Sequence, residues 1–147
     1  MRERLYGCVA LLVAAVGLSV LVATAAEGDK ALTDKQIELQ AKLKKLPFKI
    51  VYESYRGKDW ELFLVNADGS GGKNLTNTPD ADDMYPHASP DGKQICFVVD
   101  QGKGSEKSRS VYVIGADGKG RRLIARDARQ PCWSPDGRKI AYLPAEF

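Results

Sequence analysis

The sequence is poor in the side chains that most enzymes and metal centres use. It has one histidine, His87, and three cysteines among 147 residues. A single histidine excludes a multi-histidine metal site within one chain, and any Ser-His-Asp triad would have to include it. The G-x-S-x-G motif is absent, which excludes the nucleophile elbow of an α/β-hydrolase from this sequence. We therefore expect no catalytic residue, no bound metal and no cofactor.

The sequence also lacks an excess of one charge sign. Lys and Arg total 22, Asp and Glu total 19, and the net charge of +3 comes from interspersed residues. A nucleic-acid-binding protein needs a basic patch or stripe, and the sequence shows no such stripe. Nucleic acid is therefore not an expected partner.

Long apolar runs are missing except at the N-terminus. Arg2 and Arg4 precede an uncharged stretch over residues 5–26, and residues 23–25 (ATA) match a signal-peptidase site. We expect a signal peptide over residues 1–25. The alternative is an uncleaved membrane anchor, since the stretch is long enough to span a bilayer. Only in that case is a membrane an expected partner, and both readings predict a periplasmic or secreted protein.

Residues 26–47 form a short connector with a helical signal. Thr33 and Gln36 have the capping-box spacing, in which each side chain satisfies the other residue's backbone N–H. Pro47 then stops the helix, because proline lacks the N–H that a helix interior requires. The apolar residues between them give only a partial stripe, so we expect a helical spacer.

From residue 48 onward the pattern changes to that of β-strands. Segments rich in Val, Ile, Tyr and Phe are separated by clusters of Gly, Pro and Asp, and no further helical pattern follows. We therefore expect an all-β, antiparallel body. The expected strands span residues 48–54, 60–66, 73–76, 86–89, 94–99, 110–115, 121–124, 131–134 and 139–143.

Two turn sequences alternate along this body. SPDG occurs at residues 89–92 and 134–137, 45 residues apart, and ADG occurs at residues 67–69 and 116–118, 49 residues apart. Proline presets the first central position of a turn, and glycine takes the left-handed conformation that closes a hairpin with a bulge. The Asp side chains are expected to accept hydrogen bonds from nearby backbone N–H groups. A period of 40 to 50 residues with four short strands per unit is typical of propeller blades.

The same residues resemble the β-propeller repeat of TolB-type proteins, which is also found in the propellers of prolyl-oligopeptidase-type enzymes. The resemblance covers residues 48–147 and departs at His87 and Ala88, where the family usually has an aromatic residue before the serine. It implies antiparallel four-stranded blades. The matching segments are residues 54–57, 61–63, 66–69, 75–76, 86, 89–92, 112–113, 116–118, 123, 133–137 and 140–142.

The number of repeats predicts about two blades. Residues 48–76 supply the later strands of one blade, residues 77–124 a whole blade, and residues 125–143 the opening hairpin of another. A closed propeller typically has at least four blades. A fragment of a longer protein is the favoured explanation of this count. The alternatives are a ring assembled from several chains and blades that stay partly open.

The resemblance implies that this chain binds other molecules and does not catalyse a reaction. We expect an exported, non-enzymatic module that binds other envelope or secreted proteins. Self-assembly through open sheet edges is a further expectation, because unpaired strand edges invite pairing between chains. The alternative is the propeller portion of a hydrolase or lyase whose catalytic part is absent from this sequence.

Three minor candidates remain. Cys96 and Cys132 could pair, since an oxidising compartment permits a disulfide, although both lie in strands expected to be buried. Asp80, Asp82 and Asp83 could offer oxygen ligands to calcium, but they match no known calcium loop and are expected to solvate a long loop. His87 stands at the repeat position of Cys132, which favours a structural or surface role.

Overall fold

The computed structural model describes residues 32–102 and 106–145. The signal peptide predicted for residues 1–25 lies outside the described residues. In the described part of the chain, no helix is both long and apolar enough to cross a membrane.

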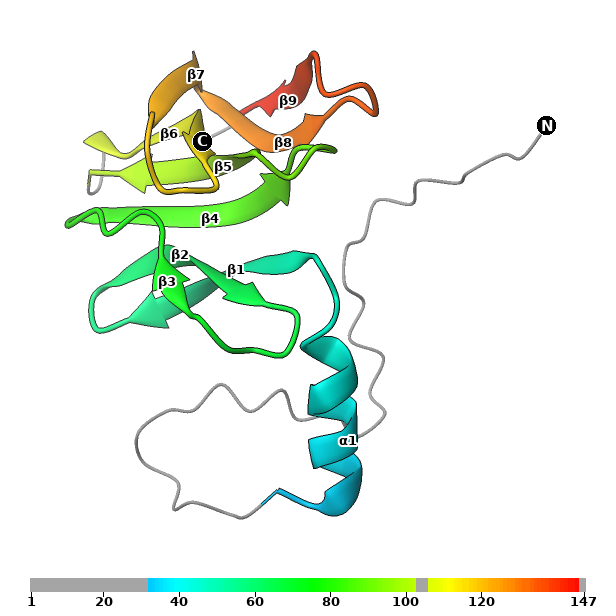
Figure 1. The fold of residues 1–147 in the computed structure, drawn as a ribbon. Coiled ribbons are helices and arrows are strands. Elements are labelled where there is room, and N and C mark those ends of the chain that lie inside the picture. The colour runs from blue at the N-terminus through cyan, green and yellow to red at the C-terminus, as the bar shows by residue number, and fades with distance from the viewer. Residues whose placement is uncertain (1–31, 103–105, 146–147) are drawn as a thin grey trace.

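Helix α1 (Asp34–Leu43) follows the predicted capping box. The Thr33 hydroxyl accepts a hydrogen bond from the Gln36 backbone N–H at 3.4 Å, and the Gln36 side chain accepts one from the Thr33 N–H at 2.8 Å. None of the helix residues is buried. The helix lies beside the first sheet and away from the others (Figure 1).

The described residues form three antiparallel sheets, which we call A, B and C (Figure 1). Sheet B has four strands in sequence order and is one complete blade, with the partial sheets A and C on either side of it. The predicted all-β fold with about two propeller blades is confirmed. Sheet A contains β1 (Lys49–Arg56), β2 (Asp59–Asn66) and β3 (Lys73–Asn74); sheet B contains β4 (Ala81–Ala88), β5 (Gln94–Gln101), β6 (Ser108–Gly115) and β7 (Arg122–Arg126); sheet C contains β8 (Ala128–Trp133) and β9 (Ile140–Pro144).

Strands β4 and β8 begin earlier than the sequence predicts. We expected them at residues 86 and 131, but they start at Ala81 and Ala128. Each contains a β-bulge where the pairing register shifts, and the bulged residues Tyr85 and Gln130 have positive φ angles of 55° and 52°. A bulge interrupts the alternation of side chains, so a strand that contains one does not show the period of two.

The SPDG turns satisfy their own polar groups as predicted. The Ser89 hydroxyl donates to the Asp91 carboxylate at 2.6 Å and accepts from the Gln94 N–H at 3.0 Å. Gly92 has a φ of 70°, which favours glycine. The second SPDG turn repeats these bonds at 2.6 and 2.9 Å. The serine hydrogen bond lowers the pKa of Asp91, which stabilises its charged form within the turn.

Replacing Ser89 by alanine is expected to lower the free energy of unfolding by about 1 kcal/mol, because the buried hydroxyl that accepts from the Gln94 N–H is lost. Urea denaturation followed by circular dichroism measures the change. The matched control is Ser134→Ala, where a more exposed turn lets water replace the lost bonds. A cost at Ser134 as large as that at Ser89 would contradict this account.

The core lies on both sides of sheet B. Strand β5 is buried on both faces from Ile95 to Asp100, because its alternate residues point towards sheet A and towards sheet C. The cluster between sheets A and B consists of Leu62, Leu75, Ala81, Ile95, Phe97, Val99 and Ile114. The buried residues on the opposite side of sheet B are Cys96, Val98, Val111 and Val113.

Candidate functional site

The strand directions give the sheets two different ends. One end carries the SPDG and ADG turns, whose polar groups are satisfied within the turns. The opposite end carries the β1–β2 turn, the β5–β6 connection and the first residues of β4 and β8. This second end, which we call the loop end, holds the candidate binding residues.

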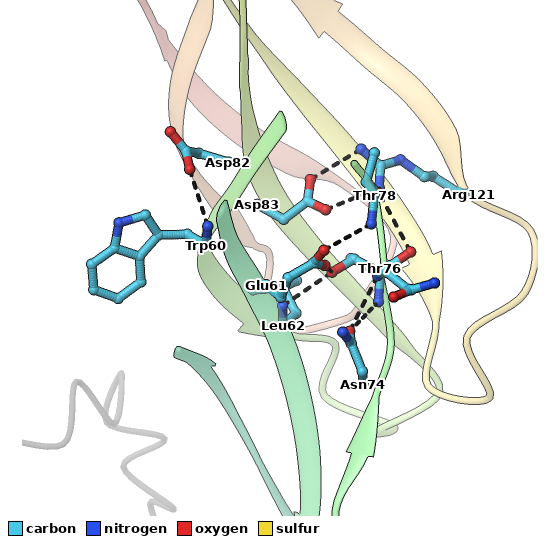
Figure 2. A network of polar contacts seen from close by, with 10 residues as sticks. Trp60, Glu61, Leu62, Asn74, Thr76, Thr78, Asp82, Asp83 and Arg121 are labelled. Atoms are coloured by element: carbon cyan, nitrogen blue, oxygen red, sulfur yellow. Dashed lines mark hydrogen bonds and ion pairs between the residues drawn. The ribbon is translucent and has the colours of Figure 1, made fainter. Parts of the chain in front are cut away.

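Aromatic side chains are exposed at the loop end. Tyr55, Trp60 and Tyr85 are all exposed, and the rings of Tyr55 and Trp60 meet edge to face with centroids 5.7 Å apart. Their backbones are held in place, since the Trp60 N–H donates to Asp82 at 3.0 Å (Figure 2) and the Tyr85 N–H donates to the Glu53 carboxylate. Exposed aromatic residues on a fixed backbone are enriched at protein interfaces.

A cleft of about 310 Å³ opens where β4 and β8 approach each other at the loop end. It is lined by Tyr85, Arg109, Arg129 and Gln130. Tyr85 and Gln130 occupy the same position of the 45-residue repeat and are the two bulged residues with positive φ. A positive φ is unfavourable for a bulky residue, and such conformations cluster at ligand and switch sites.

Two arginines line the cleft, and Arg109 is the one that is paired with a carboxylate. Arg109 forms a bidentate pair with the nearly buried Asp100, at 2.6 and 2.5 Å, and this hydrogen bonding raises the pKa of Arg109. Arg129 donates from Nε to the Pro144 carbonyl at 3.1 Å, the one hydrogen bond of its guanidinium among the described residues. Its terminal N–H groups therefore remain available for a carboxylate, which guanidinium binds in bidentate geometry.

A polar network joins sheets A and B below the loop end (Figure 2). Glu61 accepts from the Thr78 N–H at 2.9 Å and from the Thr76 hydroxyl. Arg121 donates to the Thr78 hydroxyl and to both Asp83 oxygens, at 3.1 and 3.0 Å. Glu61 and Asp83 are buried, and their oxygens are matched by these donors. The network is therefore a structural link between two blades.

The predicted loop placement of the acidic cluster was wrong. Asp82 and Asp83 lie in β4, and Asp80 immediately precedes the strand with a φ of 61°. Neighbouring residues of a strand point to opposite faces. Asp82 accordingly accepts from Trp60, whereas Asp83 pairs with Arg121. Within residues 32–102 and 106–145, no three His, Cys, Asp or Glu side chains gather as a metal ion would require.

His87 connects β4 to β8. Its Nδ1 accepts from the Trp133 N–H at 3.3 Å, and its Nε2 lies 3.5 Å from the Cys132 sulfur. In a neutral imidazole with Nδ1 as acceptor, the proton resides on Nε2 and points towards the sulfur. His87 therefore links β4 to β8 through polar contacts with two neighbouring residues of β8.

Cys96 and Cys132 are both thiols in the structure. The Cys96 sulfur lies 3.5 Å from the His87 carbonyl oxygen, and burial raises the pKa of Cys96 to about 12. A nucleophilic or metal-binding cysteine needs a lowered pKa, because the thiolate is the reactive form. Cys96 is therefore a packing residue, as its buried strand predicted.

The cleft could not be recognised from the sequence. Tyr85 and Gln130 lie outside the predicted strands, and no role was predicted for Arg109 or Arg129. The one indication in the sequence that Tyr85 and Gln130 are equivalent was their spacing of 45 residues, which is also the spacing of the two SPDG turns. This spacing could not reveal a cleft, because the two positions approach each other only after sheets B and C pack together.

Comparisons with known proteins agree with the repeat pattern. No family model matches the chain. Over 56 residues it is 38% identical to the Tol-Pal system protein TolB of Xanthomonas oryzae pv. oryzae, Xanthomonas euvesicatoria pv. vesicatoria and Xanthomonas axonopodis pv. citri. The match covers 36% of this chain and 13% of each relative, so the chain matches only a small part of those proteins.

A search of solved structures finds the β-propeller domain of the Trilobed protease from Pyrococcus furiosus. The similarity has a TM-score of 0.45 and 21% sequence identity, and it covers 64% of this chain and 30% of that one. Together with the three sheets described above, the TolB match makes this chain a TolB-like β-propeller repeat protein.

Proposed function

We propose that this TolB-like repeat protein is an exported, non-enzymatic module that binds another protein of the cell envelope at the loop end. In this proposal residues 1–25 direct export to the periplasm or beyond, residues 26–47 form a spacer, and residues 48–147 form the binding part. The match to a protein of the Tol-Pal system supports an envelope role. The proposal assigns no catalytic, cofactor-binding or metal-binding residue.

The observation that carries this proposal is the cleft between the two bulged strands. Tyr85 and Gln130 are held in an unfavourable backbone conformation at the same repeat position, and both line the cleft. The unfavourable conformation occurs at both repeat positions, although neither side chain contributes to the core clusters. A binding role explains why the bulges point these side chains outward.

The chemistry of the cleft suits a peptide segment that bears a carboxylate. Arg129 offers bidentate donors, Tyr85 offers an aromatic face, and Gln130 offers an amide that both donates and accepts. The exposed Tyr55 and Trp60 continue this surface at the same end. An acidic side chain or a C-terminal carboxylate of a partner protein is the group that we expect to enter the cleft.

Site-specific photocrosslinking in the cell that produces the chain tests this function. A photoreactive phenylalanine at position 85 is expected to give a discrete adduct with an envelope protein, identified by mass spectrometry. The matched control places the same group at exposed position 93, in a turn at the opposite end of sheet B. Equal adducts from both positions, or none from position 85, would contradict a binding site in the cleft.

The charge of the cleft gives a second readout. Arg129→Glu is expected to lower the adduct yield about tenfold, because it replaces an attractive charge by a repulsive one at the partner carboxylate. Arg138→Glu, which changes the net charge equally in the turn after SPDG, is the control and is expected to leave the yield unchanged. Circular dichroism of both variants shows whether the sheets are intact.

A further inference from the structure

Sheets A and C each leave one face uncovered by the described strands. The three sheets stack in the order A, B, C, so both faces of sheet B are covered. Sheet A covers sheet B with the side that carries Val51, Leu62 and Leu64. The other side of sheet A and the outer side of sheet C are covered by no described strand, and we call them the A face and the C face. Helix α1 lies beside sheet A, but none of its residues is buried.

The A face repeats the surface of sheet B that is buried against sheet A. Its apolar residues stand 45 or 49 positions before their counterparts in sheet B, the spacings of the SPDG and ADG turns. Ile50 is 43% exposed, whereas its counterpart Ile95 is 2% exposed. The four pairs of equivalent residues are Ile50 and Ile95, Tyr52 and Phe97, Phe63 and Tyr112, and Val65 and Ile114.

The contacts on the two surfaces are also alike. The rings of Tyr52 and Phe63 are stacked with centroids 5.7 Å apart, and those of Phe97 and Tyr112 lie 6.2 Å apart. An arginine covers each pair. Arg56 lies 5.1 Å from the Phe63 ring centre, and Arg121 lies 5.1 Å from that of Tyr112. The A face therefore has the same kinds of residues and ring contacts as a surface that another blade covers.

The C face repeats the opposite surface of sheet B. By the 45-residue repeat, Ala141 and Leu143 of β9 correspond to Cys96 and Val98 of β5. Val98 is 0% exposed because sheet C covers it, whereas Leu143 is 48% exposed. Among the described residues, sheets A and C thus display the two halves of one blade-to-blade contact, which sheets A and B and sheets B and C already make with each other.

We propose that the C face of one copy of this chain packs against the A face of a second copy. The second copy is the occupant that fits, because the internal contacts A–B and B–C show that surfaces of this repeat are complementary. A contact between two different faces is heterologous, and it closes when the rotation between units allows. Two copies place six sheets in the ring, and these sheets together hold about four blades' worth of strands, the lower limit of the four to eight blades of known propellers. We therefore infer a closed dimer with two identical A–C junctions.

This inference goes beyond the proposed function, because it concerns contacts between copies of this chain and not a partner in the cleft. The two surfaces adjoin, since Arg129 of the cleft is the register partner of Leu143 on the C face. It also differs from the expected pairing through strand edges, since it uses the faces of the sheets. The A–C junction is apolar, so burial of Ile50 and Leu143 supplies the driving force. A charge placed at either position would lose its hydration in the junction and oppose association.

Sedimentation equilibrium of the whole chain tests the dimer, with circular dichroism as a check on folding. The wild-type chain is expected to have twice the mass of a single chain. Ile50→Glu and Leu143→Glu are each expected to weaken the dimer at least about 100-fold. Leu39→Glu, a similarly exposed apolar residue on α1, is the control and is expected to leave the dimer unchanged.

Mixing the two variants gives the decisive result. An equimolar mixture of Ile50→Glu and Leu143→Glu is expected to associate more tightly than either variant alone, because the intact C face of the first variant meets the intact A face of the second. The other junction then carries both charges, so the mixed dimer is expected to stay weaker than the wild type. A monomeric wild type, a variant that stays dimeric or a mixture that associates no more tightly than either variant alone overturns the proposal. If either variant loses its β-sheet signal, Tyr52→Lys and Ala141→Asp repeat the test. Crosslinking at position 85 is measured separately, so failure of the dimer leaves the proposed function standing.

Discussion

Replacing Phe97 by alanine is expected to lower the free energy of unfolding by about 3–5 kcal/mol, the cost of removing a large buried aromatic side chain. Phe97 is 0% exposed and lies in the centre of the cluster between sheets A and B. Its ring contacts that of Tyr112, with centroids 6.2 Å apart, and supports the Arg121 guanidinium at 5.3 Å. Urea denaturation followed by circular dichroism measures the loss.

The matched control for this change is Tyr52→Ala at the equivalent repeat position on the A face. Tyr52 has one side on solvent, so its removal is expected to cost about 1 kcal/mol when the chain is dilute enough to be monomeric. Both changes remove one aromatic ring from the same strand position of a blade. Similar costs for the two variants in the monomer would show that the contact between sheets A and B is not the core of this fold.

Replacing Arg121 by alanine is expected to cost about 3 kcal/mol at pH 7. Asp83 is fully buried, and its two oxygens accept from Arg121 at 3.1 and 3.0 Å. Breaking a buried ion pair from one side leaves an uncompensated charge, which destabilises far more than loss of an exposed pair. Arg122→Ala removes an exposed arginine from the neighbouring position and is expected to cost less than about 0.5 kcal/mol.

The cost of Arg121→Ala is expected to depend on pH. Burial raises the pKa of Asp83 above its usual value, and Arg121 opposes this shift. A carboxyl with a raised pKa in the folded state favours folding at low pH, and this contribution is lost as the pH rises through the folded pKa. Without Arg121 the pKa rises further, so the variant is expected to recover stability as the pH falls towards 4. Urea denaturation at pH 7, 5.5 and 4 measures this recovery, and a cost that is constant with pH would argue against Asp83 as its source.

Local chemistry in the sequence was sufficient to predict most of the fold. The SPDG and ADG turns place serine, aspartate and glycine within a few residues, and their hydrogen bonds close inside each turn. The turns fix where strands end, and their 45- and 49-residue spacings reveal the blade repeat. The capping box at Thr33 was equally local. Features that depend on contacts between near neighbours in the chain could therefore be predicted without a structure.

The candidate site could not be predicted in the same way. The bulges at Tyr85 and Gln130 break the alternation that identifies strands, so β4 and β8 were predicted to begin too late. The partner of Asp83 is 38 residues away, and its position in a strand rather than a loop follows from pairing with β5. The sequence showed an acidic cluster, but only the pairing showed that its members point apart.

The sequence by itself determined the repeat, the turns and the antiparallel blades, because each depends on hydrogen bonds and backbone preferences within a few residues. The tertiary structure alone decided which side chains share the cleft, which acidic residues are buried and which two faces stay open. Those properties depend on the packing of one sheet on the next, which joins residues about 40 positions apart. Copies of one repeat therefore differ in exposure from sheet to sheet, as Ile50 and Ile95 show.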